Sequence, residues 1–582
     1  MTSPESGTGV DRSKREAQSL TDLLFLSRGD IGPGGVFAVL LAVASMVVVL
    51  VALAGQTRIA AVLLAVLLVV LGLFTVPLGN ATGVHPTLGM HSDTRLLALI
   101  SVGIIGLHQA SIDGFGWLTL VLLAGVIIGE TALRRLHTYT VNAVANLPGQ
   151  PQHRVDRLPT QLMSAVSVLA IALAAASAVF GSTWLPALVV TLVVGTVAIL
   201  DLFGRINRLR FDRRNRKRLT KAVQAYAPTF AVHWRADPGT DYQISMWLPF
   251  LQRLGKPFIV IVRTPENFAE ALALTDVPVL LRRNMVDLDD IVVPSLKTVF
   301  YVNNATANSQ MVRYPGLRHI MLNHGDSDKA PSYNPVSRMY DKNFVAGQAA
   351  IDRFTSHGVE ISPSQFAIVG RPQIEDVAKA SGPIGEVSRP RVLYAPTWAG
   401  FTADAAYSSL AVGPLLVKAL LDRGCDVVFR PHPYAYRSPA LTAACTEIAA
   451  LLHADASPEA KHAYGEQAEK LWSLSECFNN SDAMISDVSG VVADYLYSNK
   501  PLAMCAVHAS AADFVTEFPL AEVAYLLEVT KTGITDLDAT LDQLLKSDPL
   551  AEPRHKLRTY YLGDPGDRPY ADLFFDEAAK YV

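Results

Sequence analysis

Two hydrophobic patterns divide the sequence near residue 225. The first part contains six long apolar runs, at residues 36–54, 59–78, 96–107, 117–133, 162–180 and 185–202. A helix of about 20 residues crosses the hydrocarbon core of a membrane, so most of these runs are long enough to span one, and the third is the shortest. The pattern predicts a domain of about six transmembrane helices over residues 36–203.

The second part alternates short apolar runs with amphipathic segments, which is typical of an open α/β sheet. Strands are expected at residues 229–234, 257–262, 277–281, 298–302, 318–322 and 344–346, and, after a link at 381–390, at 392–394, 426–430 and 483–485. We therefore predict two Rossmann-like units, at residues 226–385 and 386–582, with a cleft between them. A more helical tail from residue 511 is expected to brace the first unit.

The basic residues predict which side of the membrane each segment faces. With the tail of residues 1–35 inside, the outside connections carry one basic residue, Arg58, and the inside ones carry Arg95, Arg134, Arg135, Arg154, Arg157 and the dense run at 204–225. Because Lys and Arg near segment ends stay on the cytoplasmic side, both termini and the α/β part are predicted to be cytoplasmic, at the cell membrane. The run at 204–225 is a stop-transfer flank, a juxtamembrane helix on anionic membrane lipids, or both.

The composition argues against several classes. The four cysteines lie in the C-terminal third without a C-x-x-C pair, which argues against a zinc site or a disulfide framework and suits a reducing compartment. The net charge of -3 gives no sign of a nucleic-acid partner. Because His108, Glu130 and Asp201 lie near the ends of apolar runs, we favour a membrane anchor that presents a lipid-linked substrate over a transporter.

The stretch 483–504 carries the clearest candidate chemistry. It reads as strand, hydroxyl-rich turn, helix and strand, and its turn holds Ser486, Asp487, Ser489 and Gly490. In a βαβ unit such a turn lies at the carboxyl end of the sheet, where backbone N–H groups can hold a phosphate. One interpretation is part of a nucleotide-diphosphate site; the other is that Asp487 or Ser489 only caps the helix.

Four stretches in this order carry a family resemblance: LNHGDSDK at 322–329, VLYAPTWAG at 392–400, FRPHP at 429–433 and SDVSGVVADYLYSNKP at 486–501. Together they resemble the CDP-glycerol glycerophosphotransferase family, which builds poly(glycerol phosphate) chains of wall teichoic acids. The resemblance covers about residues 226–501. It implies a GT-B-like fold, CDP-glycerol as the donor, and a place at the cytoplasmic face of the membrane.

The resemblance also implies roles for residues of the first unit. His324 and Gly325 match the family's strand-end His-Gly motif, where the imidazole is the general base for the acceptor hydroxyl. Asp326 either orients that imidazole or caps the next helix, and Lys329 is either the family's downstream lysine or a solvated side chain. The family commonly has a Trp before His-Gly and Thr-Pro after it, whereas this chain has Asn323 and Asp326-Ser327. That departure affects acceptor recognition more than phosphoryl transfer.

In the second unit, the resemblance implies that His432, with Arg430, neutralises the diphosphate as CMP departs. Ser486, Asp487 and Ser489 match the Ser-Asp-x-Ser motif, and Asp494 matches a helical Asp of the donor side. Since an anionic Asp487 would repel a diphosphate, we expect it to accept from ribose or glycerol hydroxyls, or to orient His432 or Lys500. Thr397 and Trp398 could line the nucleotide cleft, although Trp398 is also a candidate core residue.

The leading hypothesis is a membrane-anchored transferase that moves glycerol phosphate from CDP-glycerol to a lipid-linked glycan or polyol-phosphate acceptor. No Asp-x-Asp pair appears in the cleft segments, so no tightly bound metal or cofactor is expected. Loosely bound Mg²⁺ and a homo-oligomer are compatible with the sequence. The alternatives are a GT-B transferase that uses CDP-ribitol or a nucleotide sugar, and a membrane scaffold that only senses a nucleotide.

Overall fold

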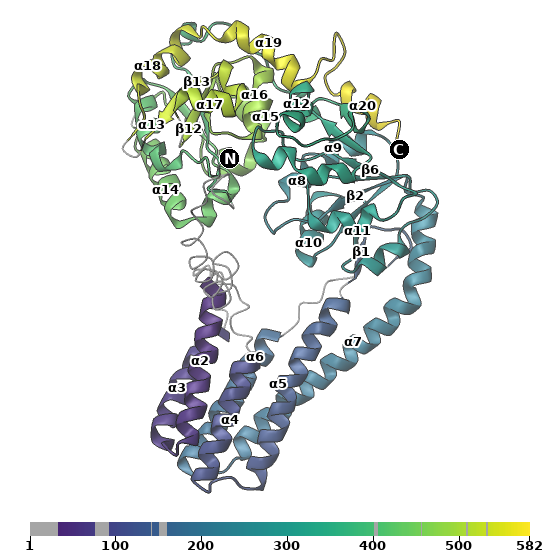
Figure 1. Cartoon of the computed structure of the whole chain (residues 1–582), viewed down its shortest axis with the longest axis vertical. Helices are drawn as coiled ribbons and strands as arrows, with labels where there is room; N and C mark the ends of the chain where they lie inside the picture. The colour runs from purple at the N-terminus through teal and green to yellow at the C-terminus, as the bar shows by residue number, and fades with distance from the viewer. Residues whose placement is uncertain are drawn as a thin grey trace, which may run out of the picture. The chain divides into compact units, whose positions relative to one another are not determined.

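The computed structural model describes residues 33–75, 92–140, 142–150, 160–400, 406–455, 457–507, 510–530 and 533–582. These residues form two compact units, which are described separately (Figure 1). One is helical and ends within the last long helix at residue 215; the other contains residues 142–153 and everything from residue 216 onward. Most of the expected cytoplasmic tail, residues 1–32, lies outside the described residues.

The helical unit follows the six apolar runs. Its helices are α2 (Pro33–Leu53), α3 (Thr57–Thr75), α4 (Ser92–His108), α5 (Gly114–Thr140), α6 (Thr160–Phe180) and α7 (Leu185–Tyr226). Within the described residues, two segments are both long and apolar enough to cross a membrane, Met163–Phe180 and Leu185–Asn207. The other crossings therefore remain predictions. Helix α7 is continuous over 42 residues, so the last apolar run and the basic run after it form one helix.

A buried ion pair joins three of these helices. The Arg95 guanidinium lies 2.7 Å from the Glu130 carboxylate, and Ser167 and Ser164 of α6 complete the cluster through hydrogen bonds of 2.6 and 2.5 Å. Both charged side chains are almost fully buried. Breaking such a pair leaves an uncompensated charge in an apolar bundle, so the cluster fixes how α4, α5 and α6 pack.

The α/β unit contains two sheets, the first parallel except at one edge strand and the second parallel throughout. The first has the order β1-β4-β3-β2-β5-β6-β7-β8. Its parallel strands are β2 (Phe230–Trp234), β3 (Phe258–Val262), β4 (Val279–Leu281), β5 (Thr298–Tyr301), β6 (Arg318–Met321), β7 (Lys342–Val345) and β8 (Phe366–Ile368). Most of their side chains are buried on both faces, which explains the near-continuous apolar runs in the sequence.

The edge strand β1 (Ala143–Ala145) was not predicted. It pairs antiparallel with β4, although its residues lie between two apolar runs of the helical unit. Asn146, at φ 59°, donates from Nδ2 to the Thr275 carbonyl at 3.3 Å, and Leu147 joins the core that also holds Leu219 and Val223 of α7. Two separate segments that flank the hairpin of α6 and α7 therefore belong to the α/β unit.

The second sheet has the order β10-β9-β11-β12-β13 and is wholly parallel. Its strands are β9 (Arg391–Ala395), β10 (Asp426–Phe429), β11 (Ala483–Ser486), β12 (Leu502–Val507) and β13 (Tyr525–Val529). Strand β13 lies in the tail, which is otherwise mainly helical, as predicted.

The end of the tail does pack on the first sheet. Helix α19 (Ala551–Leu562) contacts α12 (Gln348–Ser356), and a Cβ added at Gly347 would lie 2.4 Å from the Tyr560 carbonyl oxygen. Phe574 of α20 (Asp572–Ala578) lies against Trp247, with the ring centroids 5.4 Å apart. The predicted brace is confirmed by these contacts.

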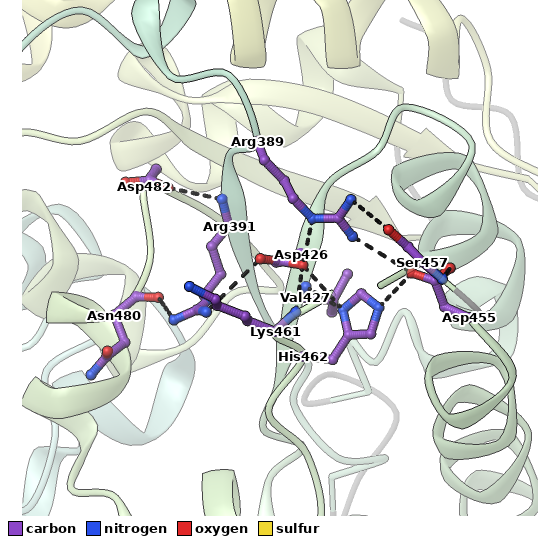
Figure 2. Close-up of polar contacts among 10 residues, drawn as sticks. All are labelled: Arg389, Arg391, Asp426, Val427, Asp455, Ser457, Lys461, His462, Asn480 and Asp482. Carbon is purple, nitrogen blue, oxygen red and sulfur yellow. Dashed lines mark hydrogen bonds and ion pairs between the residues drawn. The ribbon is translucent and has the colours of Figure 1, made fainter. Parts of the chain in front are cut away.

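A polar cluster closes the amino edge of the second sheet (Figure 2). The buried Asp426 carboxylate accepts from Arg389 Nε at 2.8 Å and from the Lys461 backbone N–H at 2.9 Å, and Arg391 lies 3.9 Å away. His462 accepts from the Val427 N–H through Nδ1 and donates through Nε2 to Asp455, as seen in Figure 2. Because most of these polar groups pair with one another at the edge opposite the strands' carboxyl ends, we assign the cluster a structural role.

Replacing Asp426 with Asn should lower the free energy of unfolding by about 3 kcal/mol, because it removes the carboxylate that holds two arginines. Urea unfolding of the full chain in detergent, followed by tryptophan fluorescence, measures this loss. Asp576→Asn is the matched control, since it breaks an exposed pair with Arg568 and should cost less than about 1 kcal/mol. Equal losses in the two variants would contradict the structural role of the cluster.

Candidate active site

The predicted motifs meet at the carboxyl edges of the two sheets. His324 follows β6, Thr397 follows β9, His432 follows β10 and the turn of Ser489 follows β11. The two sides are in contact: a Cβ added at Gly490 would lie 3.1 Å from the Asp326 carbonyl oxygen, a tight approach for any side chain. The sheets therefore bring the two halves of the predicted site together.

His324 is held as a neutral base. Its Nδ1 lies 3.1 Å from the Val302 carbonyl oxygen, which can only accept, so Nδ1 carries the proton and Nε2 keeps a lone pair. Burial lowers the pKa of His324 to about 4, against the opposing effect of the Val302 carbonyl, and the charge of Arg371 lowers it further. A neutral imidazole with a free Nε2 lone pair can accept a proton at neutral pH.

His432 is held in the opposite tautomer. Its Nδ1 accepts the Tyr434 backbone N–H at 3.1 Å, so the neutral ring carries its proton on Nε2. Burial lowers the pKa of His432 to about 4, and the charges of Lys329, His324 and Arg437 add to this effect. The site thus holds one imidazole that can take a proton and one that can donate a hydrogen bond.

Tyr242 lies beside both imidazoles. Its ring stands edge-to-face to His324, with centroids 5.9 Å apart, and to His432, with centroids 6.2 Å apart. The Trp398 ring stacks on the imidazole of His432, with the ring centroids 6.1 Å apart. Sequence reasoning missed Tyr242; the available signal was its place directly after the Pro- and Gly-containing loop that follows strand β2, at the first residue of helix α8 (Tyr242–Ser245).

Lys329 supplies a cation that reaches from the first sheet to the second. Its Nζ lies 3.4 Å from Thr397 Oγ1 and 5.6 Å from the centre of the Tyr407 ring. Burial lowers the pKa of Lys329 to about 8, and the carboxylate of Asp487 opposes that shift. These contacts argue against a freely solvated side chain, and the match of Lys329 to the family's downstream lysine stays a prediction.

Asp487 holds a loop of the cleft. Its Oδ2 accepts the Thr397 N–H at 2.7 Å, and the carboxylate also accepts the Ser409 N–H at 3.2 Å. Burial raises the pKa of Asp487 to about 6. The prediction that Asp487 orients Lys500 is wrong, because Lys500 donates to the carbonyls of Phe478 and Ser481 instead.

Three expected donor-binding side chains are engaged elsewhere. Arg430 donates to the carbonyls of Ala468 and Trp472, the latter at 2.8 Å. Asp494 forms a buried two-point ion pair with Arg371, at 2.9 and 3.1 Å. Ser486 donates from Oγ to the Ala395 carbonyl at 2.6 Å. These side chains therefore bind neighbouring backbone and side-chain groups of the protein, whereas direct contacts with the donor were predicted.

Ser489 does not cap the helix that follows it. It precedes helix α16 (Gly490–Tyr495) but makes no capping hydrogen bond, and its buried Oγ has no partner among the described atoms. The capping interpretation is therefore wrong for Ser489. Asp326 does not orient His324 either, because its carboxylate pairs with Arg353 and the Val302 carbonyl holds the imidazole.

Within the part of the chain that the structure describes, no group of three or more His, Cys, Asp or Glu side chains is placed to bind a metal ion. The carboxylates nearest the cleft already have partners: Asp326 pairs with Arg353, and Asp487 accepts backbone N–H groups.

Two neutral imidazoles in opposite tautomers and a lysine gather where the carboxyl edges of the two sheets meet, and this arrangement suits a group-transfer enzyme of the α/β class. Residues 297–511 match the family model for CDP-glycerol:poly(glycerophosphate) glycerophosphotransferase. The predicted resemblance to that family is confirmed, and the chain is a transferase.

Comparison with solved structures gives distant similarities. The wall teichoic acid polymerase TagF is 14% identical over 66% of this chain and 97% of its own, with a TM-score of 0.40. UDP-GlcNAc 2-epimerase from Neisseria meningitidis is 11% identical over 60% of this chain and 99% of its own, with a TM-score of 0.38. A glycosyltransferase from Rickettsia africae is 11% identical over 60% of this chain and 96% of its own, with a TM-score of 0.37. No curated protein matches the sequence.

Proposed function

We propose that this chain transfers glycerol phosphate from CDP-glycerol to a hydroxyl of a lipid-linked glycan or polyol-phosphate acceptor and releases CMP. The observation that carries the proposal is the pair of neutral imidazoles in opposite tautomers, His324 and His432, both beside Tyr242 in the cleft. The family match includes every predicted site residue, since all of them lie within residues 297–511. A GT-B-like arrangement of the two sheets would place donor and acceptor on opposite walls.

In the proposed step, His324 Nε2 takes the proton of the acceptor hydroxyl. The resulting oxygen nucleophile attacks the phosphorus that bears glycerol, and the bond from that phosphorus to the CMP oxygen breaks. His432, through Nε2–H, and Lys329 stabilise the charge that moves onto the departing CMP phosphate. Ser489 Oγ is the further donor that we assign to the diphosphate. Any Mg²⁺ would enter the cleft with the donor.

The membrane part is proposed to hold the catalytic unit where lipid-linked acceptors are made. The chain leaves the α/β unit after β1 and returns to it along α7, and the two helices long enough to span a membrane lie between these points. If strand β1 and the end of α7 lie on the same side of the membrane, the chain crosses the membrane an even number of times between them. We infer that a cysteine at Ser182 is labelled only from outside and one at Ser356 only from inside; labelling of both from the same side would contradict this topology.

The direct test supplies membranes that contain the full chain with radiolabelled CDP-glycerol. We expect label in a lipid-soluble or polymeric acceptor, and no comparable transfer from CDP-ribitol or UDP-sugars. Preference for one of those donors would support the alternative transferases, and nucleotide binding without turnover across acceptors would support the sensing scaffold. Loss of glycerol phosphate from the cell-envelope glycans of cells that lack the protein is the corresponding result in vivo.

The rate should depend on pH through two cleft groups. The pKa of His324 is lowered to about 4, so the base stays neutral from pH 7 down to about 5, and kcat/KM falls below that. The pKa of Asp487 is raised to about 6, but a neutral carboxyl oxygen still accepts the Thr397 N–H, so its protonation should change kcat/KM much less. The pKa of Lys329 is lowered to about 8, so kcat/KM falls again as pH rises through 8 and the cation that binds the diphosphate is lost. A rate profile of CMP release from pH 4 to 10 measures both limbs, and an acid limb at pH 6.5 would contradict the buried, neutral base.

A further inference from the structure

The loop at 325–329 carries two carboxylates and connects the proposed base to the proposed cleft cation. It follows the base His324, ends at the cleft cation Lys329, and contains Asp326 and Asp328. Carboxylates that faced the cleft would repel a diphosphate and would raise the pKa of both imidazoles.

Arg353 of helix α12 binds both carboxylates. It donates to Asp328 Oδ1 from Nε at 3.0 Å and from Nη2 at 2.7 Å, and it donates to Asp326 from Nη1. The side chain of Arg353 is 5% exposed. Burial would lower the pKa of Arg353, but the two carboxylates outweigh that effect and raise it. The planar guanidinium fork suits two carboxylates in a way that an ammonium does not.

Helix α19 of the C-terminal tail contacts both Asp328 and helix α12. Tyr561 of α19 donates its hydroxyl to Asp328 Oδ2 at 3.3 Å, and Tyr560 donates to Asp352 Oδ2 at 2.8 Å. The close approach at Gly347, before the first turn of α12, holds the two helices together. The position of Arg353 is therefore set by elements from both ends of the α/β unit.

The loop also touches the donor side of the cleft. The Asp326 backbone lies against Gly490, beside the unpartnered Ser489 hydroxyl. A loop that moved to relieve repulsion between Asp326 and Asp328 would therefore disturb the base, the lysine and the donor turn together.

We propose that Arg353 is a positioning residue for the transfer, which holds Asp326 and Asp328 away from the cleft and thereby fixes the loop between His324 and Lys329. The inference rests on the proposed function. It assigns to the loop two properties that can be measured: the affinity for the anionic donor and the pKa of the neutral base.

The test compares three variants of the full chain in CMP release from CDP-glycerol. Arg353→Gln leaves both carboxylates uncompensated and should raise the donor KM about 10- to 100-fold, with the acid limb of kcat/KM moved to higher pH. Arg353→Lys keeps the charge without the fork and should give intermediate values. The triple variant D326N/D328N/R353Q removes all three charges and should bring KM and the acid limb back towards the wild-type values.

Arg389→Gln is the matched control, because Arg389 also bridges two carboxylates, Asp426 and Asp455, but at the opposite edge of the second sheet. It should lower the thermal midpoint and leave KM and the acid limb unchanged.

A folded Arg353→Gln variant with unchanged KM and acid limb would overturn the inference. If Arg353→Gln does not fold, a triple variant that folds with a KM and acid limb near the wild-type values supports the inference, and one that keeps a raised KM overturns it. Absence of CMP release by the wild type would instead overturn the proposed function.

Discussion

Replacing His324 with Ala is expected to lower kcat for CMP release by about 10²- to 10⁴-fold, with little change in the donor KM. In the proposed step the lone pair on His324 Nε2 accepts the proton of the acceptor hydroxyl, while the Val302 carbonyl only fixes the ring. Initial rates with saturating CDP-glycerol, together with donor binding to the variant, measure the two effects separately.

His357→Ala is the matched control for that loss, since His357 is exposed at the end of helix α12. It should change kcat by less than about twofold. Added imidazole should restore part of the rate to the His324 variant, because a small base can enter the vacated space. A His324→Ala enzyme that keeps a third or more of the wild-type kcat would exclude His324 as the general base.

Replacing His432 with Ala should lower kcat by about 10²- to 10³-fold, the loss found when one preorganised donor to a developing charge is removed. Since His432 donates through Nε2–H as a neutral ring, the loss should be the same from pH 6 to pH 8. His432→Gln, which retains an N–H donor, should recover part of the rate.

The Gln variant separates a hydrogen-bond role from an acid role. An imidazole that had to give up its proton could not be replaced by an amide, so equal losses in His432→Ala and His432→Gln would contradict the assignment. A loss that grew steeply with pH would contradict it as well.

The sequence predicted most of the strands, although not β1, β8 and β13, and the edge at which the motifs meet. Parallel strands have strong apolar patterns, and their carboxyl ends share one edge. It could not predict which way each motif side chain points. Successive residues at a strand end point to opposite faces, so Ser486 bonds to a neighbouring strand while Asp487 reaches the loop of Thr397.

Most of the missed parts of the site depend on contacts between residues far apart in the chain. Arg371 meets Asp494 across 123 positions, and Arg353 meets Asp328 across 25, and neither arginine stands in a motif. The two histidine tautomers depend on the Val302 carbonyl and the Tyr434 N–H. Strand β1 has three residues, which is too short for a period-2 pattern to be distinguished from a loop.

The identity of the released nucleotide tests the central claim most directly. Purified full chain would be incubated with an acceptor and CDP-glycerol that carries ¹⁴C in glycerol and ³²P in the phosphate attached to it. Transfer by attack on phosphorus predicts that both labels enter the acceptor in equal amounts and that unlabelled CMP is released one for one. Release of CDP, with ³²P left on the nucleotide, would show cleavage on the glycerol side and would contradict the account.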